Sequence, residues 1–254
     1  MSPFLLRRHY EVFLVGDPSL KPEYANLAEL SYVKGIGESE ITFTGFYRYT
    51  NNAIYRVNTI LNENESDWYH GNSVLIRSYT NAGNNQALGG EISADLKLKP
   101  WWKIYVGGSL YHFTIQGEIF EFQVDQKSTN WTLNANTTFS IAKQFKLFWS
   151  LAVKSATVTA QGGDELFYMS DATFSWKPKK AENLNLMIKV VDMFASNDQG
   201  LYTQGYDKTG TEVFYQATTY HRYGPILELN FTYAINSSVQ KKKNLDSEFG
   251  KDEF

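Results

Sequence analysis

Residues 89–111 show the pattern of hydrophobic and polar positions that recurs along most of the chain. Between residues 91 and 98, polar and apolar side chains alternate without interruption, and the alternation resumes from Trp102 to Leu110 after a Lys-Pro-Trp turn. Because successive side chains of a strand point to opposite faces, this period of two predicts a β-hairpin with one apolar and one polar face. The apolar face would meet a second sheet in a soluble sandwich, or lipid in a transmembrane barrel.

The same alternation predicts further strands in both directions from this hairpin. They cover residues 26–34, 41 onward toward Ile60, a returning strand through Val74 and Ile76 into the hairpin, 131–139, 145–153, 168–176, 184–190 and 227–235. We therefore expect nine strands, or ten if the roughly alternating residues 6–14 form one more. The stretches 116–130, 161–165 and 195–223 are predicted to be loops.

Connections between the predicted strands alternate between short and long. Short turns fall near residues 35–37, 99–101, 142–144 and 178–183, whereas the other connections are polar and longer. Lysines gather near the short turns together with Trp101, Trp102 and Trp176, and carboxylates gather in the long loops. Short turns at one end and long loops at the other, with strands of about ten residues and aromatic side chains at an interface, favour a transmembrane barrel. A soluble sandwich stays open, and a requirement for detergent distinguishes the two.

Composition excludes several functions. The 254 residues include no cysteine, which excludes disulfides, thiolate zinc sites and a cysteine nucleophile. A net charge of -3 provides no overall basic field for nucleic acid. The sequence contains no run of roughly 20 apolar residues, so no transmembrane helix is predicted. The mean hydropathy of -0.39 does not distinguish a membrane barrel from a soluble protein, because barrel strands alternate apolar with polar residues. Residues 1–8 do not have the pattern of a secretory signal.

Residues 16–23 read GDPSLKPE and are followed by ELSY at residues 29–32. This resembles the GNP-x-LKPE … E-x-GY signature of TonB-dependent outer-membrane receptors, with Asp17 in place of the usual Asn and Ser31 in place of the usual Gly. Residues 47–54 are similar to an ascending strand of that family, and residues 224–233 to its closing strand. The overall pattern looks most similar to the group called the outer-membrane protein β-barrel family.

The resemblance implies an all-β, antiparallel, up-and-down transmembrane β-barrel segment with about nine to ten strands of a larger, 22-strand barrel. We expect residues 1–22 to form an external loop and a partial strand, residues 23–236 the barrel segment, and residues 237–254 a charged periplasmic tail. A TonB box and a plug domain are not recognised, so we expect the C-terminal part of a receptor.

That family imports a ligand, such as a siderophore, peptide, vitamin or glycan, across the outer membrane of Gram-negative cells. The implied partners are therefore outer-membrane lipid, a plug domain with the remaining barrel strands, the TonB system acting through those parts, and the imported ligand.

Candidate ligand contacts are aromatic side chains of the expected external loops: Trp68, Tyr69, Tyr202, Tyr206 and Tyr215. No catalytic, cofactor-binding or metal-binding residue is predicted, because the four histidines lack metal-site spacing and no nucleophile signature occurs.

Two alternatives stay open. The polar face of the strands also fits a non-energised porin or adhesin. An outer-membrane hydrolase would need an acidic side chain beside His70 or His221 to activate water.

Overall fold

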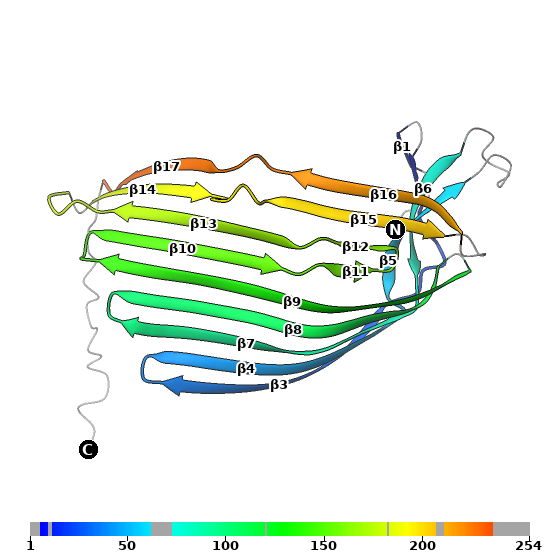
Figure 1. Ribbon diagram of the computed structural model, residues 1–254, viewed down its shortest axis with the longest axis horizontal. Helices are drawn as coiled ribbons and strands as arrows, with labels where there is room; N and C mark the ends of the chain where they lie inside the picture. The colour runs from blue at the N-terminus through cyan, green and yellow to red at the C-terminus, as the bar shows by residue number, and fades with distance from the viewer. Residues whose placement is uncertain are drawn as a thin grey trace, which may run out of the picture.

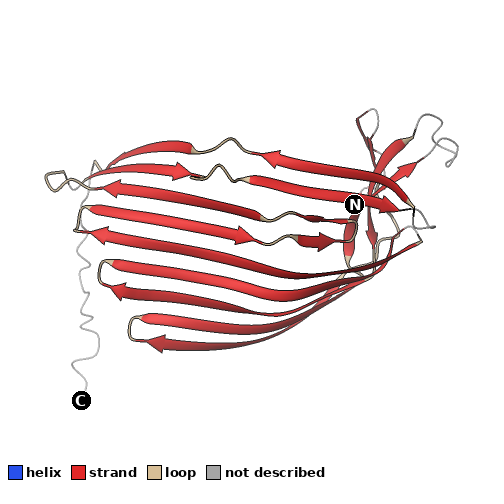
Figure 2. Ribbon diagram, in the orientation of Figure 1, coloured by secondary structure: helices blue, strands red, loops and turns tan. Residues whose placement is uncertain are grey.

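The computed structural model describes residues 6–9, 12–61, 73–119, 121–181, 183–206 and 211–235, which are strands joined by turns and loops (Figure 2). Nine of these strands form one antiparallel sheet (Figure 1). From one edge to the other they are β17 (Ile226–Tyr233), β14 (Leu184–Val191), β13 (Phe167–Trp176), β10 (Phe145–Lys154), β9 (Phe122–Ile141), β8 (Trp102–Ile119), β7 (Asn84–Lys99), β4 (Ser39–Asn51) and β3 (Tyr24–Ile36). We call this sheet the wall.

The wall consists of the nine strands that alternation predicts, so the all-β, antiparallel prediction is confirmed. The short turns also lie where they were expected: β3 ends at Ile36 before β4, and β9 ends at Ile141 before β10. Among the described residues, β3 and β17 pair with one neighbour each and form the two edges of the wall. No helix in the described part of the chain is long and apolar enough to cross a membrane.

The cross-strand register places the apolar side chains of the wall on one face. Residues directly opposite each other share a face, and one such row runs through Tyr32, Phe43, Ile92, Gly108, Leu133, Val153 and Tyr168. Leu229 is 75% exposed, and Leu96, Leu133 and Leu151 are each only partly buried. None of these leucines is sealed between two layers, so the sandwich alternative is wrong.

Aromatic side chains stack across the strands beside the short turns. Trp102 stacks on Phe139 with ring centroids 5.5 Å apart, and Phe145 stacks on Trp176 at 6.3 Å. The indole Nε1 of Trp102 donates to Thr137 Oγ1 at 2.9 Å, which satisfies its donor on the apolar face. This arrangement is typical of an interfacial aromatic girdle.

Two four-stranded sheets lie at the opposite end of the wall from these turns (Figure 1). One contains β1 (Leu6–His9), β2 (Val12–Leu14), β6 (Val74–Asn81) and β5 (Ile54–Leu61), and we call it the cover sheet. The other contains β11 (Thr157–Thr159), β12 (Gly162–Asp164), β15 (Asp198–Tyr206) and β16 (Glu212–His221), and it extends the direction of the neighbouring wall strands.

The predicted loops were wrong. Residues 116–119 and 122–130 belong to the paired strands β8 and β9, residues 195–223 contain the paired strands β15 and β16, and residues 161–165 contain β12. The cause is an inversion of polarity at this end of the sheet: Ile115 and Val124 are buried on the inner face, while Gln116 and Asp125 point outward. The apolar face that predicted the strands therefore stops before the strands do.

Two further expectations about strands were wrong. Residues 6–14 do not add a tenth strand to the wall, because β2 pairs in parallel with β6 of the cover sheet. The strand from Ile41 does not continue toward Ile60, because Asn52 has a φ of 53° and β5 then enters the cover sheet. The returning strand is likewise divided, since β6 and β7 belong to different sheets.

Candidate functional site

The inner face of the wall, on which the cover sheet packs, is polar along its middle. Thr44, Glu91, Ser109 and Thr132 lie directly opposite one another on four adjacent strands. Ser109 Oγ and Thr132 Oγ1 share a hydrogen bond of 2.7 Å. These hydroxyls and the carboxylate line an open hollow of about 240 Å³. The hollow presents hydrogen-bonding groups to whatever fills the space behind the wall, as the polar interior of a barrel does.

A charged group lies on the same face nearer the short turns. Glu38, Asp95, Lys97 and Lys103 border a second hollow of about 290 Å³. Lys97 Nζ forms an ion pair with the Glu38 carboxylate. This hydrogen bond, together with the positive charge of Lys97, holds the pKa of Glu38 below its ordinary value. Both signs of charge occur here, so this part of the inner face does not select for one sign of ligand charge.

The cover sheet packs against the inner face through a small hydrophobic core. Val57 of β5 is fully buried and belongs to one cluster with Ile115, Ile119 and Val124 of the wall. On the other face of these wall strands, Asp125 accepts hydrogen bonds from Lys127 at 3.1 Å and Gln116 at 3.4 Å, which lower its pKa. Polar side chains outside and apolar side chains inside are the reverse of the arrangement near the short turns, so this end of the wall lies beyond the apolar belt.

Polar contacts hold the cover sheet in place. The carboxamide of Gln161 spans Asn58: its Oε1 accepts from Asn58 N at 2.7 Å, and its Nε2 donates to Asn58 O at 2.9 Å. Arg77 Nη2 of β6 donates to Gln216 Oε1 of β16 at 3.3 Å. Residues from β4–β7 and from β11–β16, far apart in the sequence, are thereby joined across the inner face.

The chain approaches itself very closely where the cover sheet leaves the wall. A Cβ on Gly117 of β8 would lie 1.6 Å from the backbone oxygen of Ala82. Ala82 N donates to Ala53 O at 3.0 Å, which ties the two connections of the cover sheet together. Only a residue without a side chain fits at position 117.

Tyr55 anchors the same region of β5. Its hydroxyl accepts a 2.8 Å hydrogen bond from Asn85 Nδ2 of β7. Burial of the ring raises the pKa of Tyr55, and the bond from Asn85 offsets only part of that rise. Tyr55 is therefore neutral at any physiological pH.

The predicted ligand contacts that the structure describes, Tyr202, Tyr206 and Tyr215, do not converge. Trp68 and Tyr69 lie outside the described residues. Tyr202 stacks on Tyr215 with ring centroids 6.4 Å apart, whereas Tyr206 stacks on Phe122 at 5.0 Å. Gln216 accepts a hydrogen bond from Arg77 of the cover sheet. Tyr215, the preceding residue of β16, points to the opposite face of that strand and therefore away from the cover sheet. The three described tyrosines form two separate aromatic contacts.

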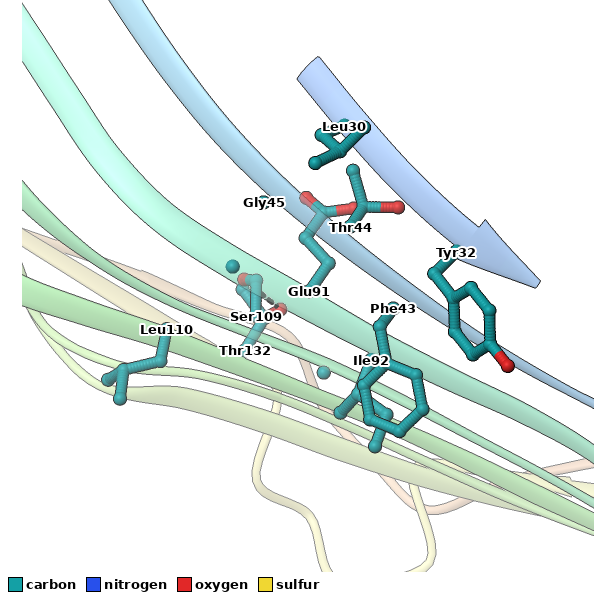
Figure 3. A pocket seen from close by; sticks show the side chains of 12 residues that line it. Leu30, Tyr32, Phe43, Thr44, Gly45, Glu91, Ile92, Ser109, Leu110 and Thr132 are labelled. Atoms are coloured by element: carbon teal, nitrogen blue, oxygen red, sulfur yellow. Dashed lines mark hydrogen bonds between the residues drawn. The ribbon is translucent and has the colours of Figure 1, made fainter. Parts of the chain in front are cut away.

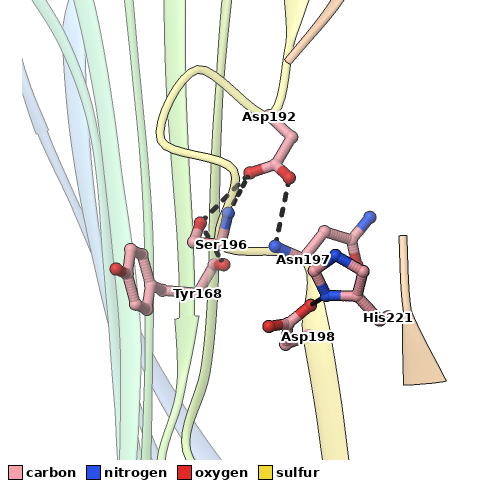
Figure 4. A network of polar contacts seen from close by, with 6 residues as sticks. All are labelled: Tyr168, Asp192, Ser196, Asn197, Asp198 and His221. Carbon is pink, nitrogen blue, oxygen red and sulfur yellow. Dashed lines mark hydrogen bonds and ion pairs between the residues drawn. The ribbon is translucent and has the colours of Figure 1, made fainter. Parts of the chain in front are cut away.

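His221 has the acidic neighbour that the hydrolase alternative requires. Its Nδ1 contacts the carboxylate of Asp198 on the paired strand β15 (Figure 4). Ser196 lies nearby, but its Oγ donates to Tyr168 O at 2.9 Å and to Asp192 Oδ1 at 3.1 Å. The hydroxyl of Ser196 is thus engaged in fixing the loop before β15 and is not among the described contacts of His221.

The loop before β15 is built around Asp192. Its carboxylate accepts from the backbone N–H groups of Ser196 at 2.8 Å and Asn197 at 3.1 Å (Figure 4). These bonds close a turn in which Asp192 and Ala195 both have positive φ. In the described part of the chain, no group of three or more His, Cys, Asp or Glu side chains could hold a metal ion.

One antiparallel sheet with an apolar outer face, an inner face that is polar along its middle, short turns beside an aromatic girdle and two small sheets at the other end is typical of a wall of the outer-membrane β-barrel class. Residues 1–233 match the model of the outer membrane protein beta-barrel family, and the chain belongs to that family. Its place is accordingly the outer membrane. No curated protein and no solved structure matches the chain.

Proposed function

We propose that the chain forms the wall and the external cover of a TonB-dependent receptor, which imports a ligand across the outer membrane. The observation that carries the proposal is the cover sheet, since it folds over the inner face at the end opposite the short turns and is fixed there by Val57, Gln161 and Arg77. A passive pore requires an unobstructed opening at each end of the barrel. A cover on the external side suits a transporter that admits a selected ligand.

The edges of the wall indicate the partner that this function requires. Sheet edges exposed to hydrocarbon leave backbone groups without hydrogen bonds, so barrels close. Eight successive antiparallel pairings make β3 and β17 run in the same direction. Direct closure, or closure by a second copy turned about the membrane normal, would therefore give parallel pairs. Fully antiparallel closure needs an odd number of further strands, which we assign to the remaining barrel of the receptor, with its plug domain inside.

Photo-crosslinking from the two edges tests this assignment. A photoreactive amino acid would replace Val33 on β3 or Asn230 on β17 in the natural gene product, with the mid-wall residue Ser109 as control. We expect the two edge positions, and not the control, to crosslink to strands that belong with a plug domain. Crosslinks joining only two copies of the described wall would contradict the proposal.

The polar inner face also supports a second candidate, a porin that is not energised. Planar bilayers separate the two candidates, because a porin conducts ions when reconstituted alone and a plugged receptor does not. Persistent conductance of the natural protein, unchanged when Gln161 is replaced by Ala, would favour the porin.

A further inference from the structure

The outer face of the wall carries a hollow of about 600 Å³ (Figure 3). Its floor is formed by Gly45, Gly90 and Gly108 on three adjacent strands, where Gly45 lies directly opposite Gly90. Its sides are apolar side chains of four strands: Leu30, Tyr32, Phe43, Ile92 and Leu110. The hollow therefore lies between large apolar side chains of the outer face.

Internal packing does not explain two of these glycines. A Cβ on Gly45 would have no atom within 4 Å, and a Cβ on Gly90 would lie 3.4 Å from the nearest atom, the backbone oxygen of Thr44. Neither glycine has a positive φ. Gly108 differs, because its Cβ would lie 2.8 Å from Thr132 O. Since glycine inside a strand weakens it, the free space above Gly45 and Gly90 requires another reason.

The chemistry of the sides restricts what can fill the hollow. Leu30 is 81% exposed and Leu110 59%, and the side chain of Glu91 belongs to the inner face with Thr44 and Ser109. An occupant gains apolar contact there and has no charged group to pair with. The hollow is continuous with the apolar belt that contacts lipid in an outer-membrane protein, so hydrocarbon chains reach it without crossing water.

We propose that this hollow is a binding site for one acyl chain of an outer-membrane lipid. The acyl chain lies against the protein backbone at Gly45 and Gly90 and between the side chains of Phe43, Ile92 and Leu110. It therefore contacts protein on its sides as well as beneath. Lipids elsewhere on the belt contact only the tips of side chains. The site holds its chain longer than the rest of the belt because it buries more apolar area.

Photolabelling with lipid tests the proposal. The protein is reconstituted in phosphatidylethanolamine bilayers that contain a small fraction of phosphatidylcholine with a diazirine in its acyl chain, and adducts are located by mass spectrometry. The reference is the outer surface at Leu147, Phe174, Ile188 and Leu229. We expect about fivefold more adducts per exposed residue on Leu30, Phe43, Ile92 and Leu110, in proportion to the longer residence.

Matched variants show whether the hollow causes the enrichment. The double variant Gly45→Leu/Gly90→Leu fills it and should reduce labelling to the reference level. Ala94→Leu adds the same side chain to the outer face of β7 outside the hollow and should keep the enrichment. Gly45→Val alone, where a Cβ meets no atom, should give an intermediate loss even if the double variant fails to fold. Uniform labelling of the natural protein, enrichment that survives the double variant, or crosslinks from these residues to a second copy would each overturn the proposal.

Discussion

Single glycines in this wall have opposite steric surroundings, and the difference can be measured. Gly117 lies where the backbone of Ala82 passes over β8, whereas Gly45 lies beneath open space. Gly117→Ala should destabilise the folded protein by about 1–3 kcal/mol, because the added methyl group forces the two backbones apart. Gly45→Ala should instead stabilise it by about 0.5–1 kcal/mol, because it restricts the unfolded chain without a clash. Urea unfolding in lipid vesicles gives both values, and equal effects would contradict the steric explanation.

Tyr55 makes the attachment of the cover sheet sensitive to alkaline pH. Its pKa is raised in the folded protein by burial, so the unfolded state loses this proton first as the pH rises. The stability that Tyr55 contributes is complete below the unfolded pKa, near 10, and is lost as the pH rises through the folded pKa.

Tyr55→Phe therefore should remove the part of the alkaline loss that belongs to this residue, at the cost of the hydrogen bond from Asn85. The measurement is the free energy of unfolding between pH 8 and pH 11 for both proteins (flanking the pKa of tyrosine, about 10). Parallel curves over that range would show that Tyr55 is not the titrating group.

At the scale of elements, the cover sheet depends on a few contacts and can open separately from the wall. Gln161→Ala removes two hydrogen bonds to the backbone of Asn58, which together contribute about 1–3 kcal/mol. We expect amide hydrogen exchange in β5 and β6 to accelerate by about tenfold or more, with the middle of β8 unchanged.

Gln123→Ala is the matched control for that variant. Gln123 Nε2 donates a hydrogen bond of 2.8 Å to Glu118 Oε2 on the exposed face of the same region. This hydrogen bond does not involve the cover sheet. Its loss should leave exchange in β5 and β6 unaffected. If both variants accelerate exchange equally, the cover sheet is not held by Gln161.

At the scale of the whole molecule, the apolar belt sets the position of the wall in the membrane. Leu133 and Thr129 both belong to the outer face of β9, but Leu133 lies in the apolar row and Thr129 beyond it, beside Lys127 and Asp125. Leu133→Arg should cost about 2–4 kcal/mol of folding free energy in lipid, as charge near the middle of hydrocarbon does. Thr129→Arg should cost less than about 1 kcal/mol. Similar costs at both positions would place the membrane boundary elsewhere.

The sequence by itself determined the nine strands of the wall, its two faces and its short turns. Each of these depends on neighbours in the chain: alternation between residues 131 and 139 places Leu133 and Thr132 on opposite faces whatever they pack against. Lipid then selects the apolar face as the outer one. A resemblance carried by residues 16–23 and 29–32 indicated the family, and the family comparison agrees with it.

Only the tertiary structure decided what lies at the end of the wall opposite the short turns. Gln161 and Asn58 meet across 103 positions of the chain, and His221 meets Asp198 only because β15 and β16 pair. Val124 was predicted to lie in a loop because its apolar side chain faces inward, where the cover sheet replaces water. A local pattern reports which face of a strand is apolar. What covers that face depends on distant segments brought together by folding.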